Sequence, residues 1–237
     1  MRKFLSICVI TLCSVYAMYA QNSVQKIDSV SCGTNVSVQA TSKDGFYHFV
    51  VWKIENGNDT LGTVAKDGSV SQGNGYGATV SDTIDGTSGV ETSTLSLSPL
   101  DNNLINAATS GTVTFEAVFD IDSYTINGIV NDSTMGSVSG SGTTTGSTSV
   151  TLTATVNQDA TCARFDHWED ESGQTIPGDA ANPNQLTVTP EATWAHGSTH
   201  TYKAVFVTKT ININVKSSDT NMGTVTIIAP SSTSTGN

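Results

Sequence analysis

Positively charged residues are scarce in this chain. Among 237 residues there are 10 Lys and Arg against 21 Asp and Glu, so the formal net charge is −11 at pH 7. Binding to nucleic acid or to an anionic membrane surface needs clustered Lys and Arg. The composition therefore argues against both classes of partner and suits a soluble protein outside the cell.

Cysteine is also rare, with four in the chain. Cys8 and Cys13 lie in an apolar N-terminal run, and only Cys32 and Cys162 lie beyond it. Two cysteines so far apart make neither a disulfide framework nor a metal-ligand cluster. We expect two separate, part-buried thiols; the alternative, a bridge between them, would have to join different modules of the chain.

Long apolar runs are missing except at the N-terminus, where two basic residues precede the stretch Phe4–Tyr19. This order is typical of a secretory signal peptide, and the run is short for a membrane span. The sequence predicts a signal peptide at residues 1–20, cleaved after Ala20 or alternatively after Ala17. No membrane insertion is expected after its removal.

Apolar spacing of three and four residues, the mark of an amphipathic helix, is likewise missing, and Pro99–Ser110 is the one place where a short helix is expected. Alternating polar and apolar residues are common instead. They occur in Thr112–Phe119, Ser149–Thr155 and Thr201–Val207. Such alternation with β-branched residues predicts strands with one buried face. The expected fold class is all-β with, at most, one short helix.

An internal repeat is present. Phe115–Phe119 resembles Tyr202–Phe206, and Met135–Val138 resembles Met222–Val225, both at an offset of 87 positions. Other pairs keep the same order at different offsets: Asn35–Thr41 with Ser149–Thr155, Phe49–Trp52 with Phe165–Trp168, and Leu95–Pro99 with Leu186–Pro190. The longer interval in the first copy places an insertion at 62–90, rich in Gly, Ser, Thr and Asp, which we expect to be a surface excursion.

These pairs divide the chain into a signal peptide (1–20), a first module (24–120) with the insertion, a second module (121–208) and the start of a third (209–237). Because the third copy has no Phe-x-x-Trp segment before Asn237, we expect the chain to stop inside a module.

The second copy carries its motifs in a fixed order: Gly136-x-Val138, Val150–Ala154, Phe165-x-x-Trp168, Asn182-Pro183 and Tyr202–Phe206. This order resembles a bacterial repeat family related to the internalin B-repeat, of the divergent B-repeat kind. The first copy departs from it, since it has no clear Gly-x-Val opening and has Phe115 where a closing Tyr is usual. The resemblance implies tandem β-grasp-like modules in exported, surface-associated proteins that act as stalks, spacers or adhesion modules, without catalysis.

Aromatic residues are few, at 7% of the chain, and half of them fall inside these motifs. Large side chains must dominate the core of so small a module. We expect core positions for Phe49, Trp52, Phe119, Phe165, Trp168, Tyr202 and Phe206. Trp194 has no counterpart in the first copy and sits in a polar loop, so it is the candidate for an exposed aromatic that contacts a ligand.

Two polar clusters could carry chemistry. The segment Asp166–Glu171 could be a solvated hairpin, a calcium site or a pair of catalytic carboxylates. Simple alternation puts Asp166 on the face of Trp168, and His167 and Glu169 on the other, so the carboxylates do not all converge, which favours the hairpin. His196 and His200 lie four apart, but a helix is not expected between them and no third zinc ligand is evident.

Nucleophile elbows, zinc-protease motifs and phosphate loops are missing from the sequence, so we expect no enzyme, no catalytic residue, no cofactor and no metal. The leading hypothesis is a secreted or cell-surface repeat protein acting as a spacer, stalk or adhesion module, with a surface glycan or a host or cell-surface protein as partner. The alternative is a carbohydrate-binding accessory region of a larger secreted hydrolase.

Overall fold

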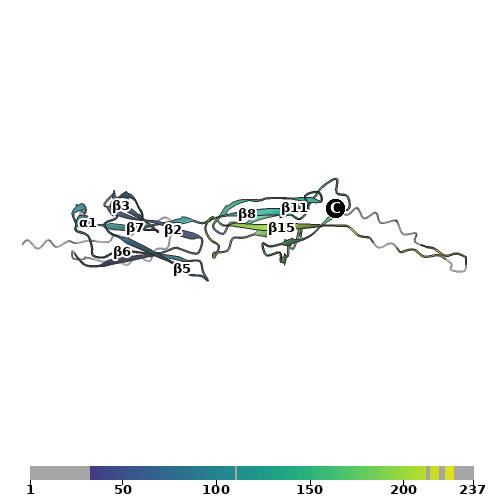
Figure 1. Ribbon diagram of the computed structural model, residues 1–237, viewed down its shortest axis with the longest axis horizontal. Helices are drawn as coiled ribbons and strands as arrows, with labels where there is room; N and C mark the ends of the chain where they lie inside the picture. Colours follow the sequence, from purple (N-terminus) through teal and green to yellow (C-terminus); the bar gives the residue numbers. More distant parts are fainter. Residues whose placement is uncertain (1–32, 110, 212–213, 219–221, 227–237) are drawn as a thin grey trace, which may run out of the picture.

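The computed structural model describes residues 33–109, 111–211, 214–218 and 222–226. Within this part of the chain, two β modules lie end to end along the long axis of the molecule (Figure 1). The predicted signal peptide and Cys32 lie outside the described residues, as do the first residues of the first module. The described residues after Lys209 contain no strand, so the truncated third module stays a prediction.

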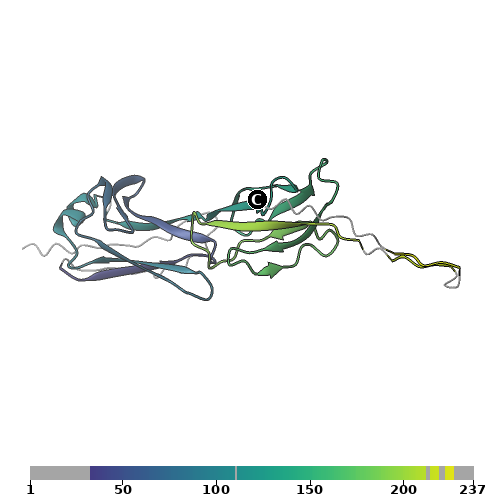
Figure 2. The same cartoon turned by 45° about the vertical axis from the view of Figure 1, so that its right-hand side comes forward.

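The first module consists of two antiparallel sheets that face each other (Figure 2). One sheet has the order β1-β6-β5, formed by Val36–Thr41, Glu91–Leu97 and Thr79–Ile84. The other has the order β4-β3-β2-β7, formed by Val70–Gly73, Asp59–Ala65, Tyr47–Asn56 and Thr114–Ile121. Both sheets contribute to a single core around Trp52, Ile54, Leu95, Leu97 and Phe115.

A short helix, α1 (Asn102–Ala107), lies at the end of the first module that points away from the second (Figure 1). It begins at Asp101, whose carboxylate accepts a hydrogen bond from the backbone N–H of Asn103 and so caps the helix. Leu104 anchors it in the core. The sequence predicted a helix in this interval and all-β structure elsewhere, and both predictions are confirmed.

The second module also has two sheets. One has the order β14-β11-β9, formed by Gln185–Val188, Val150–Val156 and Gly136–Ser139. The other has the order β10-β8-β15-β12-β13, formed by Gly142–Thr145, Ser123–Val130, Thr199–Thr208, Ala163–Glu169 and Thr175–Ile176. Strands β8 and β15 pair in parallel, from Thr199 opposite Thr125 to Ala204 opposite Val130.

The paired motifs occupy the same register in both modules. Trp52 lies opposite Ala117, as Trp168 lies opposite Ala204. In the facing sheets, Leu95 lies opposite Val38 and Leu186 opposite Leu152. The residues that match between the two copies in the sequence therefore also have equivalent strand partners in the structure.

A β-bulge interrupts the pairing of both Phe-x-x-Trp strands, between Phe49 and Val51 in β2 and between Phe165 and His167 in β12. An extra residue in one strand reverses the faces of the residues that follow it. The bulge therefore lets an aromatic pair three residues apart face the same core. It also overturns the simple alternation predicted for β12, because Phe165 packs with Trp168 in the core while Asp166 is exposed.

The interval 62–90 is largely exposed, as the sequence predicted, but it is not an irregular loop. It completes β3 and contributes β4 and β5, which widen both sheets of the first module. Val64 is fully buried, and Tyr76 is buried with a positive φ of 53°. Gly62 allows the close return of the chain, since a Cβ atom there would lie 1.9 Å from the carbonyl oxygen of Asn74.

In the described residues, the modules consist of facing sheets and a single short helix. The more specific expectation of a β-grasp-like fold stays a prediction. Among the described residues, no helix has the length and apolar character needed to cross a membrane. Cys162 is exposed and forms no disulfide within that part of the chain, so the expectation of a part-buried thiol is wrong for this residue.

Candidate functional site

The two modules are connected by a single residue. Strand β7 ends at Ile121 and β8 begins at Ser123, so Asp122 alone connects them. Its backbone N–H donates to the carbonyl of Phe46 in the first module at 2.8 Å, and its carbonyl accepts from the N–H of Gly146 in the second at 2.9 Å. The connecting residue is therefore fixed to both modules.

The loop before β15 lies directly against the first module. A Cβ atom on Gly89, whose φ is +70°, would lie 1.8 Å from the carbonyl oxygen of Ala192. A Cβ atom on Gly45 would lie 2.7 Å from the Ala192 side chain. Two glycines of the first module therefore make room for this loop of the second.

A pocket of about 360 Å³ opens at this junction. Its walls come from the start of β2, the β5–β6 turn, the connecting Asp122 and the loop Ala192–His196. The aromatic residues Tyr47, Phe49 and Trp194 line it together with charged and imidazole side chains.

Three of those polar side chains converge: His48 at the start of β2, Asp122 in the connection, and His196 in the loop before β15. Nδ1 of His48 lies 2.8 Å from Oδ1 of Asp122, and Nδ1 of His196 lies 3.2 Å from the same oxygen. The two imidazole rings have centroids 4.0 Å apart with 35° between their planes.

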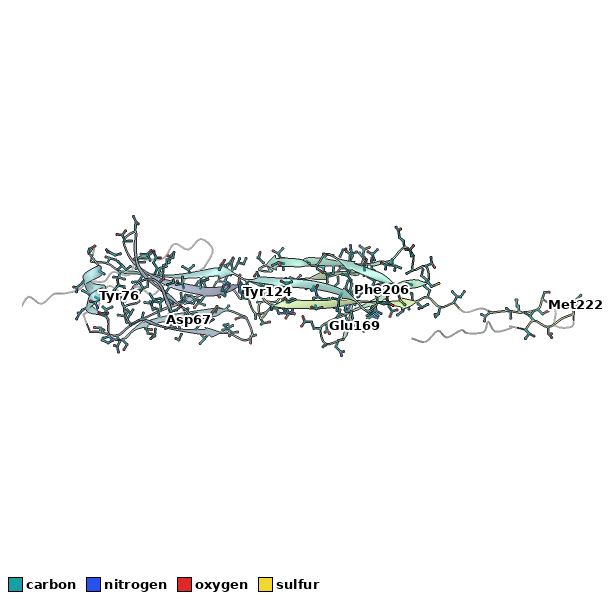
Figure 3. The ribbon with its side chains drawn as sticks, turned by 45° about the horizontal axis from the view of Figure 1, so that its top comes forward. Asp67, Tyr76, Tyr124, Glu169, Phe206 and Met222 are labelled. Atoms are coloured by element: carbon teal, nitrogen blue, oxygen red, sulfur yellow. The ribbon has the colours of Figure 1, made fainter. Side chains whose placement is uncertain are left out.

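The carboxylate of Asp122 is well shielded from water, with 7% of its side chain exposed. Tyr124, completely buried two residues further on, lies at the same junction (Figure 3). Burial, and then the negative charge of Asp122, raise the pKa of the Tyr124 phenol to about 12. The junction therefore encloses a buried carboxylate whose nearest basic side chains, within the described residues, are the two histidines.

A second ion pair borders the pocket. Glu91 is 2% exposed, and its Oε2 accepts from the backbone N–H of Phe49 at 2.7 Å. Its Oε1 lies 2.5 Å from Nζ of Lys66, which is also 3.8 Å from Asp82. These contacts tie β2 to β6 and explain why a carboxylate is tolerated inside the module.

Trp194, the residue predicted to contact a ligand, is half-buried beside the pocket. His200 stacks on its indole at 3.5 Å with 16° between the planes, and Tyr124 meets it edge-on at 5.7 Å. These neighbouring rings hold the indole in place. The role of Trp194 in ligand binding stays a prediction.

His196 and His200, considered together in the sequence, have different partners. His196 joins Asp122, whereas Nε2 of His200 lies 2.9 Å from Oγ of Ser198. Nδ1 of His200 is 3.7 Å from Oε1 of Glu171, which already accepts from the backbone N–H of Thr201. A hydrogen-bonded Ser-His-carboxylate relay needs a shorter contact than this.

The acidic segment after Phe165 forms the β12–β13 hairpin, and its carboxylates have partners within that hairpin or in the neighbouring strand β15. Asp166 and Glu169 both contact His167, at 2.9 and 3.3 Å, so Asp166 joins the pair from which simple alternation had separated it. The hydrogen bond to His167 is the main cause of the lowered pKa of Asp166, and that to Lys203 of the lowered pKa of Glu169. Asp170 closes the turn by accepting from Ser172.

Sequence reasoning missed His48 and Asp122. Neither belongs to a recognisable ligand spacing, because they are brought together by the docking of two modules. The available signal was indirect: Asp122 stands at the boundary that the repeat predicts, and His48 directly precedes the first Phe-x-x-Trp motif.

The chain matches a known family of repeat domains. A family model described as a divergent InlB B-repeat domain matches residues 16–71 and 124–209, which together cover more than half of the chain. The second match begins two residues after Asp122 and spans the second module. The first ends at Ser71, within the interval 62–90. No curated protein sequence matches the chain.

Proposed function

Because the chain belongs to the family of divergent InlB B-repeat domains, we propose that it is a non-catalytic spacer that holds repeat modules end to end at a bacterial cell surface. A spacer must transmit a fixed direction from one module to the next. The feature that supports this role is the connection between β7 and β8 through Asp122.

Connections between elements of a compact protein usually span about four to six residues. A one-residue connection leaves little backbone freedom for a hinge. The hydrogen bonds of Asp122 to Phe46 and Gly146, and the seating of Ala192 against Gly45 and Gly89, restrict it further. These contacts favour two modules that turn as one body.

Distance measurement between the modules tests this proposal. Spin labels on cysteines introduced at the exposed Asn58 and Ser172, with Cys32 and Cys162 changed to Ser, report the distance between the first and second modules. We expect a narrow distance distribution. A matched chain with ten Gly and Ser residues inserted between Asp122 and Ser123 should give a broad one. An equally broad distribution in both chains would contradict the spacer.

Ligand binding is a second candidate function, supported by the three aromatic residues that line the junction pocket. The expected partner is a surface glycan or a host or cell-surface protein that contacts Trp194. A glycan and protein binding screen with the whole chain tests this. Binding at micromolar strength or better that is lost in Trp194→Ala and kept in Trp168→Phe would support adhesion, and its absence would contradict it.

A further inference from the structure

We propose that His48, Asp122 and His196 form a binding site for one divalent transition-metal ion of the Zn²⁺ type, and that the bound ion clamps the two modules together. The site itself is independent of the spacer role, whereas the clamp deepens that role and rests on it.

The donor atoms lie close to the spacing that such an ion requires. Zinc binds imidazole nitrogen and carboxylate oxygen at about 2.0–2.2 Å, so neighbouring donors in a tetrahedral site lie about 3.3 Å apart. The two Nδ1–Oδ1 distances are 2.8 and 3.2 Å, and one ligand atom from each residue lies within 4.8 Å of the others. The two imidazole donors therefore have to approach each other by up to about 1.5 Å to complete the set.

The types of donor select the kind of ion. Two imidazoles and one carboxylate suit Zn²⁺, Ni²⁺ or Cu²⁺, whereas Ca²⁺ and Mg²⁺ require shells of oxygen. Three protein ligands leave a fourth position for water. All three residues line the junction pocket, which has room for that water.

The surroundings of His196 allow it to act as a ligand. Its Nδ1 accepts a long hydrogen bond of 3.3 Å from the backbone N–H of Ser123 and lies 3.2 Å from Oδ1 of Asp122. Because this nitrogen has one lone pair, metal binding requires the ring to turn that lone pair from the Ser123 N–H toward the ion.

Charge favours a cation at this site. The carboxylate of Asp122 is buried, and its ion-pair partners in the described residues are two histidines, which are neutral when they ligate a metal. A buried anion without a permanent cation is unfavourable. A divalent ion supplies the missing positive charge.

The placement of the three ligands makes the ion a clamp. His48 belongs to the first module, Asp122 to the connection and His196 to the second module. Main-chain hydrogen bonds position the last two, because Asp122 is held by Phe46 and Gly146, and Gly197 donates to the carbonyl of Ser123 at 2.8 Å. Parting the modules would therefore require breaking a metal–ligand bond.

Calorimetric titration of the whole chain, produced without a polyhistidine tag, with ZnCl₂ tests the site. We expect one ion per chain, and at least a tenfold loss of affinity in His48→Gln and in His196→Gln. His167→Gln is the matched control, since it removes a histidine that also lies between carboxylates but away from the junction. Undiminished affinity in His48→Gln and His196→Gln, or loss in His167→Gln alone, would overturn the site.

Two further measurements separate the site from folding and from the spacer. His196 is exposed over 46% of its side chain, so His196→Gln should keep the wild-type circular dichroism spectrum, and Co²⁺ added to the wild type should give the visible absorption of a tetrahedral centre. Absence of that absorption would contradict the geometry. The spin-label distance distribution should narrow further with Zn²⁺ in the wild type alone. A narrow distribution without any zinc binding would overturn the site while leaving the spacer intact.

Discussion

The indole Nε1 of Trp52 donates a hydrogen bond of 2.9 Å to Oγ of Ser93, while the indole of Trp168, at the same position of the second module, has no such partner among the described residues. Both tryptophans are buried at the centre of their cores. The two modules therefore share a packing scheme, but only the first provides a hydrogen-bond acceptor for the indole N–H.

Replacement of Ser93 with Ala should destabilise the first module. The Trp52 N–H would be left buried without an acceptor, at a cost of about 1–3 kcal/mol. Urea unfolding followed by tryptophan fluorescence measures this. Ser37→Ala serves as the control, because its hydroxyl bonds to Ser96 on an exposed face and its loss should cost less than about 0.5 kcal/mol. Equal costs for the two variants would contradict the assignment.

Gly136, the first residue of the Gly-x-Val motif, should not tolerate a side chain. A Cβ atom there would lie 2.3 Å from the ring of Phe206, the aromatic residue of the closing strand. Gly136→Ala should destabilise the second module by about 1–3 kcal/mol through overpacking. Gly142→Ala, where nothing lies within 4 Å of the added atom, is the matched control for thermal unfolding. A neutral Gly136→Ala would show that the ring moves aside freely.

The buried Glu91 should matter more than a carboxylate in a surface ion pair. Glu91→Ala removes the acceptor of the Phe49 N–H and the partner of Lys66, at a cost of about 2–3 kcal/mol. Glu116→Ala breaks the more exposed pair with Lys53 and should cost less than about 1 kcal/mol. The denaturant midpoints of the two variants measure these losses of stability. A larger loss in Glu116→Ala than in Glu91→Ala would contradict the stabilising role of the buried Glu91.

The pH dependence of the second module should include a contribution from His167. The hydrogen bond to Asp166, with that to Glu169, raises the pKa of His167 above its usual 6.5. Since the folded pKa exceeds the unfolded one, the stabilisation is fully present below about pH 6.5 and is lost as the pH rises through the folded pKa. NMR titration of the imidazole should give a value above 6.5 that falls in Asp166→Asn. A titration unchanged by that substitution would refute the contact.

Local pattern predicted most of the fold. Alternating residues correctly indicated β7, β11 and β15, and the interval around Asp101 correctly indicated α1. The strands β3, β4 and β5 escaped prediction because their residues are mainly Gly, Ser, Thr and Asp, and pairing with neighbours rather than intrinsic preference makes them strands. The bulge in β12 could have been inferred, since Phe165 and Trp168 cannot both face a core across three residues of regular strand.

The site was less accessible to such reasoning. Trp194 and His196 stood out because they interrupt a polar loop. His48 and Asp122 did not, because they are 74 positions apart and meet only where one module docks on the next. The spacing of residues along the chain does not predict contacts that form only when two folded modules dock on each other.

The parallel pairing of β8 with β15 has a mechanical consequence. The chain enters the second module at the start of β8 and leaves it at the end of β15, and the two strands lie side by side in register along the molecule. Tension applied between these points acts along the strands, so the hydrogen bonds that join them are loaded together in shear rather than opened one after another. We therefore expect a module with this geometry to resist extension.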